Sequence, residues 1–190
     1  SEMAATISFT LRMFSTEPTD VPPNFNTFIV FFYFKNNFIL WADIYRLSLR
    51  EMEQIWIEVS YLANIIPENN LKLMPVLAWL LIVKSKDMDL FYKFKNCDLQ
   101  SIKKYLQTKV PMDIQRNNTY YADFIILLEM CTTPPEILNN LSKAPDSENN
   151  MLANRWTNMK FTYHLFDNKP LCEYMCNILS YVSPIPVAKP

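Results

Sequence analysis

Apolar side chains recur at three- and four-residue spacing through most of the chain, and the clearest case begins at Ser48. From Met52 to Ile66 the apolar positions fall on one wide stripe of a helix. Ser48 and Glu51 form a capping box at its start, in which each side chain satisfies the other residue's free backbone N–H, and Pro67 ends it. The pattern therefore predicts an amphipathic helix with one face against a core.

The segment that follows is apolar on every side. Pro75 suits the first position of a helix, because its missing N–H is not needed there, and Val76 to Val83 contains no charged residue. A helix that is apolar all round is buried all round. We therefore expect this segment to form the centre of the fold.

The same periodicity predicts further helices on both sides of this pair. Asp87 and Asp98 are expected to cap two short helices, and Thr133-Pro134-Pro135-Glu136 repeats the capping-box pattern with proline at the first helical position. A loop is predicted from Val110 to Asn118. The class is all-α, a single multi-helix bundle of about eight or nine helices, and the other helices are predicted over residues 24–35, 38–47, 119–132, 151–162 and 168–182.

The two ends of the chain follow other patterns. From Ile7 to Met13 apolar and polar residues alternate, which is the periodicity of a strand, and we expect an extended arm there. Prolines punctuate the connector that follows and the C-terminal end. The predicted organisation is an arm and connector (1–23), a helical interaction domain (24–183) and a linker (184–190), as in a domain of a longer protein.

The chain has no glycine among its 190 residues, where the usual abundance would give about 13. Phosphate-binding loops, dinucleotide fingerprints and nucleophile elbows all require glycine, since their backbones approach a ligand closely or take positive φ. Those enzyme classes are therefore excluded. We expect asparagine and proline at the helix ends instead, with asparagine pairs at 69–70, 117–118, 139–140 and 149–150.

Charge and hydropathy argue against two further classes of partner for this segment, nucleic acids and membranes. The 18 Lys+Arg and 19 Asp+Glu leave a net charge of -1, which argues against a grip on nucleic acid phosphates. The longest apolar stretch, Leu73 to Val83, is too short to span a bilayer, so no membrane partner is expected.

Candidate chemistry is sparse. The four cysteines form no C-x-x-C, and with His164 as the one imidazole we expect reduced cysteines in a core, no metal site and no cofactor. Glu129 lies in an apolar run, where it is either a buried acid with a raised pKa or an outward-facing group paired with a lysine, and we favour the second. We do not expect an enzyme.

An aromatic stripe in the predicted first helix leaves two interpretations open. Phe28, Phe31, Phe32 and Phe34 occupy more than one helix face. The helix is either buried in the core, which we favour, or part of a protein–protein surface.

Several segments resemble the telomere-repeat-binding-factor homology domain. Leu47-Ser48-x-x-Glu51 and the stripe after it resemble the third helix of that family. Leu73-Met74-Pro75-Val76 is similar to the start of the family's buried helix, and Phe166-x-x-x-Pro170-Leu171-x-x-Tyr174-Met175 resembles its closing helix. The resemblance implies a nuclear, telomeric protein whose double-stranded DNA-binding domain lies elsewhere in the full chain.

The resemblance also implies two roles for this segment. The first is docking of shelterin-type telomere-protection proteins, which would fall on Ile65, Ile66, Leu73 and Leu77. The second is self-association through the first and last helices, with a monomer as the alternative, and it would fall on Phe28, Phe32, Met175, Ile178 and Val182.

A second class of protein fits the same helical pattern. A Bcl-2-like bundle is also all-α, has a central apolar helix like Val76 to Val83, and binds an amphipathic helix in a groove. The Gly-Arg signature typical of such bundles is absent from a glycine-free chain, which favours the telomeric interpretation.

Overall fold

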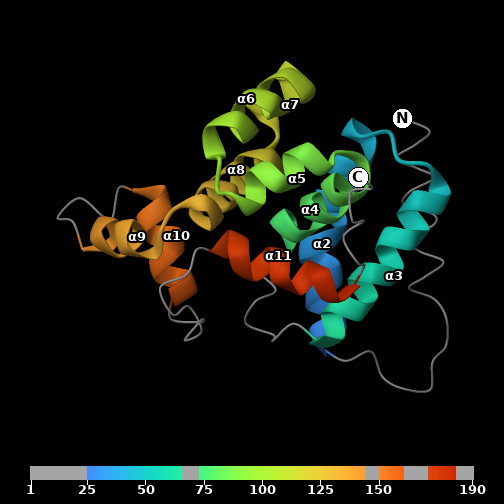
Figure 1. Ribbon diagram of the computed structural model, residues 1–190, viewed down its shortest axis with the longest axis horizontal. Coiled ribbons are helices and arrows are strands. Elements are labelled where there is room, and N and C mark those ends of the chain that lie inside the picture. The colour runs from blue at the N-terminus through green and yellow to red at the C-terminus, as the bar shows by residue number, and fades with distance from the viewer. Residues whose placement is uncertain (1–24, 66–72, 144–149, 161–170, 183–190) are drawn as a thin grey trace, which may run out of the picture.

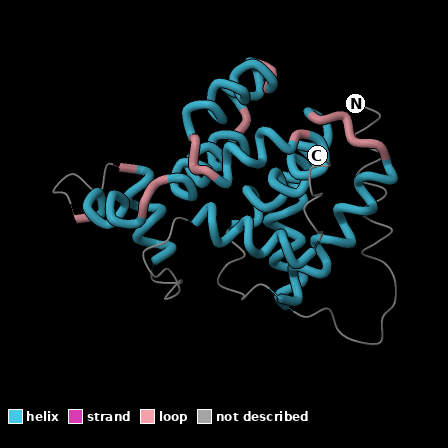
Figure 2. Tube along the Cα trace, viewed as in Figure 1, coloured by secondary structure: helices cyan, strands magenta, loops and turns pink. Residues whose placement is uncertain are grey.

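The computed structural model describes residues 25–65, 73–143, 150–160 and 171–182, and these residues form ten helices and no strand. The all-α prediction is confirmed, and the connections that the structure describes are short loops (Figure 2). The predicted arm, connector and C-terminal linker lie outside the described residues. The helices are α2 (Phe25–Ile44), α3 (Leu49–Ile65), α4 (Met74–Lys86), α5 (Met88–Lys95), α6 (Leu99–Lys109), α7 (Met112–Asn117), α8 (Thr119–Thr132), α9 (Pro135–Ser142), α10 (Met151–Lys160) and α11 (Leu171–Val182).

The centre of the molecule is α4, as its apolar sequence predicts. Every residue from Met74 to Lys84 is buried, and α2, α3, α5 and α8 pack around this helix (Figure 1). Trp79 of α4 meets Trp41 of α2 and Phe124 of α8, with ring centroids 6.3 and 5.5 Å away. These tilted and edge-on contacts are the geometry that aromatic quadrupoles favour, so the three helices share one aromatic core.

Two predicted boundaries are wrong. The helices expected over 24–35 and 38–47 are one continuous helix, α2, because the polar pair between them is held by tertiary contacts. Asn36 Nδ2 donates to the Tyr120 hydroxyl at 2.9 Å, and Asn37 is buried. The loop predicted from Val110 to Asn118 contains α7, where the Gln115 side chain donates to the Val110 carbonyl at 2.7 Å. Packing thus overrides weak local preference at both places.

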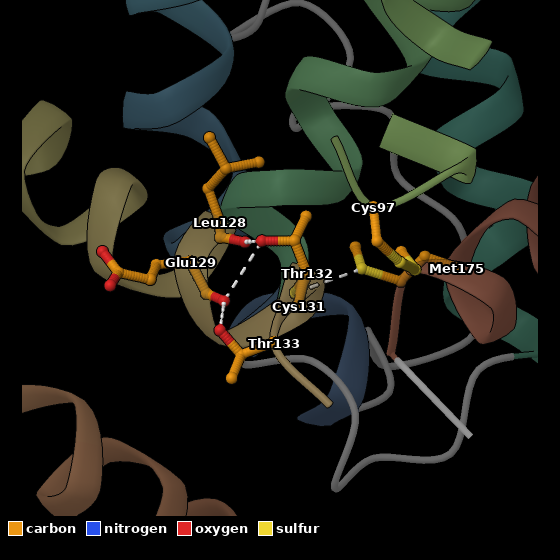
Figure 3. The surroundings of a disulfide bond; sticks show 8 residues. Cys97, Leu128, Glu129, Cys131, Thr132, Thr133 and Met175 are labelled. Carbon is orange, nitrogen blue, oxygen red and sulfur yellow. Dashed lines mark hydrogen bonds between the residues drawn. A yellow bond between two sulfur atoms is a disulfide. The ribbon is translucent and has the colours of Figure 1, made fainter. Parts of the chain in front are cut away.

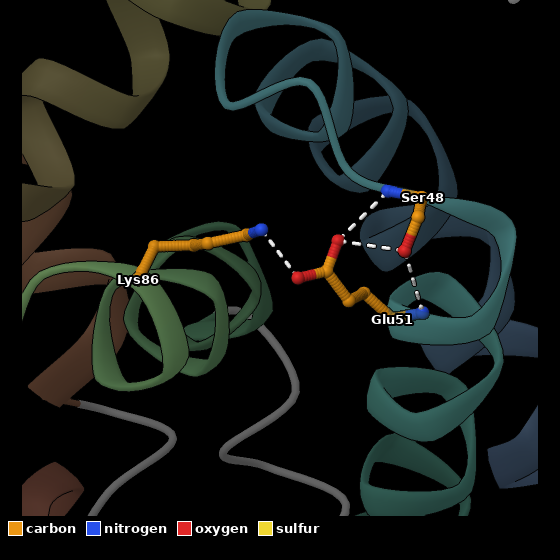
Figure 4. A network of polar contacts seen from close by, with 3 residues as sticks. All are labelled: Ser48, Glu51 and Lys86. Atoms are coloured by element: carbon orange, nitrogen blue, oxygen red, sulfur yellow. Dashed lines mark hydrogen bonds and ion pairs between the residues drawn. The ribbon is translucent and has the colours of Figure 1, made fainter.

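Three of the predicted helix starts are confirmed. Ser48 and Glu51 form the capping box, with the Ser48 N–H donating to Glu51 Oε2 at 2.8 Å and the Glu51 N–H to Ser48 Oγ at 3.4 Å (Figure 4). Asp87 accepts from the Leu90 N–H, and Asp98 accepts from the Ser101 N–H. Each acceptor satisfies one backbone donor that a helix start leaves free.

The capping box expected at Thr133 is wrong. Pro134 is the N-cap of α9 and makes no side-chain cap, while Pro135 occupies the first turn. The Thr133 hydroxyl instead donates to the Glu129 carbonyl at 2.7 Å, near the end of α8. The Thr133 hydroxyl therefore bonds to α8, although the sequence pattern assigned it to the start of α9.

Two helices end with a residue other than glycine in the left-handed conformation. Arg46 and Cys97 have φ of 51° and 55° and are the positive-φ residues of the described chain. Each follows a helix in a Schellman motif: Leu47 N–H donates to the Ala42 carbonyl after α2, and Asp98 N–H to the Lys93 carbonyl after α5. Asparagine, expected at helix ends, is the C-cap of α5 at Asn96 and of α7 at Asn118. It also caps helix starts, as Asn118 and Asn150 do.

Candidate functional site

The expectation of four reduced cysteines is wrong for Cys97 and Cys172, which form a disulfide between the end of α5 and the start of α11 (Figure 3). Their Cα atoms lie 6.5 Å apart although 75 residues separate them in the sequence, so only the fold brings them together. Cys131 and Cys176 are free and buried.

The two free thiols are unsuited to nucleophilic chemistry. Burial raises the pKa of Cys176 to about 11 and raises that of Cys131 still further. The Cys131 thiol donates to the Met175 sulfur at 3.5 Å inside the core (Figure 3). Because the thiolate is the reactive form, both side chains act as packing groups at neutral pH.

Glu129 is paired with a lysine, the second of the two interpretations. Lys103 Nζ of α6 lies 2.8 Å from Glu129 Oε2, and both side chains are partly exposed. His164 lies outside the described residues, and within the described ranges no group of three His, Cys, Asp or Glu side chains is placed to hold a metal ion. None of the helices in those ranges is long and apolar enough to cross a membrane.

Lys84 is a buried cation of the central helix, and the residue is 7% exposed. Its Nζ donates to the Leu179 carbonyl of α11 at 2.8 Å. Burial lowers the pKa of Lys84 and raises that of Glu58, and the opposite charge of each partner counteracts both shifts. The lysine thus ties the last turn of α11 to the central helix, and its role is structural.

The residues predicted for docking divide between the core and the undescribed part of the chain. Leu73 and Leu77 are buried completely around the start of α4 and present no surface to a partner in this structure. Ile65 is the last residue of α3, and its side chain and all of Ile66 lie outside the described part.

The residues predicted for self-association divide in the same way. Met175 is buried beside Cys131, and Ile178 packs partly buried against the core. Phe28 and Phe32 lie on α2 and Val182 ends α11, but their side chains are outside the described part. Among the predicted self-association residues whose side chains the structure describes, Ile178 is partly exposed and Met175 is buried.

A surface that the sequence pattern missed lies on α3, at the right of Figure 1. Leu49, Ile57 and Tyr61 are 46%, 70% and 53% exposed, and at 3.6 residues per turn they fall within roughly a third of the helix circumference. We call these three residues the outer face of α3. The sequence signal for this face was that these apolar residues lie out of phase with the buried stripe of the same helix. That stripe consists of Met52, Ile55, Val59 and Leu62.

The second candidate is a pocket of about 330 Å³ between α2, α7 and the start of α8, which we call the α2–α8 pocket. Apolar side chains and a few convergent polar groups line it, the combination that ligand-binding sites share. It was not predicted, because the Val110–Asn118 segment was expected to be a loop. Its lining residues are Asn36, Ile39, Leu40, Asp43, Ile114, Asn118 and Tyr120.

Polar contacts fix two walls of the α2–α8 pocket. The Asn36 amide donates to the Tyr120 hydroxyl at 2.9 Å, which joins α2 to α8. Asn118 Oδ1 accepts from the Tyr121 N–H at 3.1 Å and caps α8. Asp43 is exposed, and within the described ranges its carboxylate makes no ion pair. The pocket therefore combines an apolar floor with one carboxylate at its rim.

Comparison of this chain with protein-family models, with curated proteins and with solved structures finds no match.

Proposed function

We propose that this chain is a protein-interaction domain of a telomere-binding protein. In the proposal it docks telomere-protection proteins in the nucleus, while another part of the full-length chain binds telomeric double-stranded DNA. The observation that carries it is the outer face of α3, where three large apolar side chains are exposed on one side of a helix whose other side packs in the core. Ile57 and Tyr61 lie one turn apart, while the exposed Glu53 stands between Leu49 and Ile57 on the same side of the helix. Neighbouring exposed apolar side chains are a feature of surfaces that bind other proteins.

The resemblance of the sequence supplies the class of partner. Peptide docking near the third and fourth helices is what the telomere-repeat-binding-factor homology family implies, and α3 and α4 contain two of the three segments that carry the resemblance. Since Leu73 and Leu77 are buried, we place docking on the outer face of α3. The near-zero net charge suits a recruiting domain rather than a DNA-binding one.

The occupant we propose for this face is a short peptide with apolar anchors from a telomere-protection protein. Ile57 and Tyr61 are one turn apart and offer an aliphatic and an aromatic contact side by side. Buried aromatic and aliphatic anchors contribute most of the affinity in such interfaces.

Chromatin immunoprecipitation of the full-length protein tests the proposal. We expect enrichment of telomeric repeats with the wild type, and retention of telomere-protection proteins at the same DNA. The double variant Ile57→Glu/Tyr61→Glu should keep the DNA signal and lose those proteins. A matched control is Ile137→Glu on α9, since Ile137 is 50% exposed on a different helix.

Absence of telomeric enrichment in the wild type would contradict the telomeric role. Unchanged recruitment by the double variant would contradict the docking site on α3 and would leave the telomeric role standing. The two parts of the proposal are therefore tested separately in one experiment.

A further inference from the structure

We infer that the α2–α8 pocket binds the side chain of an arginine in a peptide segment of a protein partner. The inference concerns a different surface from the outer face of α3 and does not depend on telomeric identity. Its basis is the meeting, in one cavity of about 330 Å³, of apolar lining, a carboxylate without an ion pair in the described chain, and an exposed tyrosine ring.

The floor of the pocket suits an aliphatic stem. Ile39 and Leu40 of α2 face it from one side and Ile114 of α7 from the other, and all three also belong to the apolar core or pack against it. Arginine carries three methylene groups before its charged head, and such side chains bury their stems along apolar surface while the head stays at the rim. A purely polar ligand would leave this floor without a contact.

The rim of the pocket suits a cationic head. Asp43 lies one turn beyond Ile39 on α2 and is the one charged residue among the lining residues. A guanidinium binds a carboxylate through two parallel hydrogen bonds, which a lysine ammonium does not do. The pocket therefore favours arginine over lysine.

Tyr120 adds a second contact for the same group. Its ring is exposed, and its hydroxyl is held by Asn36, which restricts the orientation of the ring. A guanidinium stacks on an aromatic face, with a gain of about 0.5–1 kcal/mol at exposed sites.

The start of α8 opposes a cation but more weakly than Asp43 attracts it. Asn118 is the N-cap of α8, and a helix N-terminus carries the equivalent of about half a positive charge. The Asp43 carboxylate carries a full negative charge. Among the groups that line the pocket the negative charge is the larger, which favours a cation over an anion.

Two matched peptides test the inference, acetyl-Ala-Arg-Ala-amide and acetyl-Ala-citrulline-Ala-amide, which differ in the charge of one side chain. Titration of the isotope-labelled chain, followed by NMR, should shift the methyl signals of Ile39 and Ile114 with the arginine peptide. We expect the citrulline peptide to bind about fivefold more weakly, because it lacks the ion pair and the cation–π contact.

Asp43→Asn should abolish the difference between the two peptides. The matched control is Asp113→Asn, which removes an exposed carboxylate on α7 that does not line the pocket. Because Asp43 is exposed, Asp43→Asn is expected to keep the helical circular dichroism signal and the melting temperature of the wild type. The Ile57→Glu/Tyr61→Glu variant should bind the arginine peptide as the wild type does, which separates this inference from the proposed function.

Equal affinities for the two peptides in the wild type would overturn the inference, as would methyl shifts outside the pocket. Persistence of the arginine preference in Asp43→Asn would also overturn it. Preferential binding of acetate at the same signals would identify an anion site at the start of α8 instead.

Discussion

The two consecutive helices α3 and α4 use apolar residues in opposite ways. In α4 the residues from Met74 to Lys84 are buried, so apolar character on every side stabilises the core. In α3 one stripe packs inward while Leu49, Ile57 and Tyr61 face outward. The same residue types therefore contribute to stability in one helix and are available for recognition in the other, and substitutions should separate the two roles.

The largest expected difference comes from matched isoleucine substitutions. Ile82 of α4 is fully buried, whereas Ile57 of α3 is 70% exposed. Ile82→Ala should lower the free energy of unfolding by about 3 kcal/mol, because it removes transfer free energy and leaves a cavity. Ile57→Ala should change it by less than about 0.5 kcal/mol. Equal losses in denaturant titrations would contradict the division between core and surface.

A smaller difference is expected between two lysines of α4. Lys84→Ala should cost about 2 kcal/mol, since it leaves the Leu179 carbonyl without its donor and Glu58 without a facing cation. Lys86 is partly exposed and pairs with Glu51 on the surface (Figure 4), so Lys86→Ala should cost about 0.5 kcal/mol. Thermal unfolding of both variants measures this, and a larger loss for Lys86→Ala would refute the buried role of Lys84.

The capping box of α3 predicts a pH dependence. The Lys86 ammonium and the Ser48 N–H and hydroxyl hold the pKa of Glu51 at about 2, below its ordinary value of 4.5. A carboxyl with a lowered folded-state pKa contributes stability above the unfolded pKa and loses it as pH falls through the folded pKa. Stability from Glu51 should therefore be complete above pH 4.5 and disappear toward pH 2.

Glu51→Gln should lower the free energy of unfolding at neutral pH by about 1 kcal/mol and flatten its pH dependence in that window. Urea titrations at several pH values measure both effects. Glu53→Gln, an exposed acid on the same helix, is the control. Identical pH profiles for wild type and Glu51→Gln would exclude the proposed contribution.

The smallest predicted change is a gain. Arg46, between α2 and α3, has φ of 51°, a region where a side chain with a Cβ is under steric strain. Arg46→Gly should raise the free energy of unfolding by about 0.5 kcal/mol, because relief of strain exceeds the greater freedom of glycine in the unfolded chain. Arg46→Ala keeps the Cβ and should give no gain. Calorimetry of both variants distinguishes strain at this position from the loss of the arginine side chain.

Local signals were enough to predict most helices, the central position of α4 and three of the caps, because periodicity and capping chemistry act over a few residues. These local signals do not predict contacts between segments that are far apart in the sequence. The Asn36–Tyr120 hydrogen bond in the middle of α2 joins residues 84 apart, and the Cys97–Cys172 disulfide spans 75 residues.

Of the two candidate sites, only the pocket depends on contacts between distant segments. The α2–α8 pocket forms only where α2, α7 and α8 meet, and α7 was expected to be a loop. The outer face of α3 was visible in the sequence as apolar residues out of phase with the stripe. Leu73 and Leu77, expected on a docking surface, belong to the helix start that leads into the core.

Binding of purified telomere-protection proteins from the same organism to this chain, measured by isothermal titration calorimetry, tests the central claim most directly. The proposal predicts saturable binding by at least one of them. Ile57→Glu/Tyr61→Glu should weaken it about a hundredfold, as loss of two interface anchors of about 1.5 kcal/mol each implies, and Ile137→Glu should leave it unchanged. No binding to the wild type, or equal affinity for the double variant, would contradict the proposal.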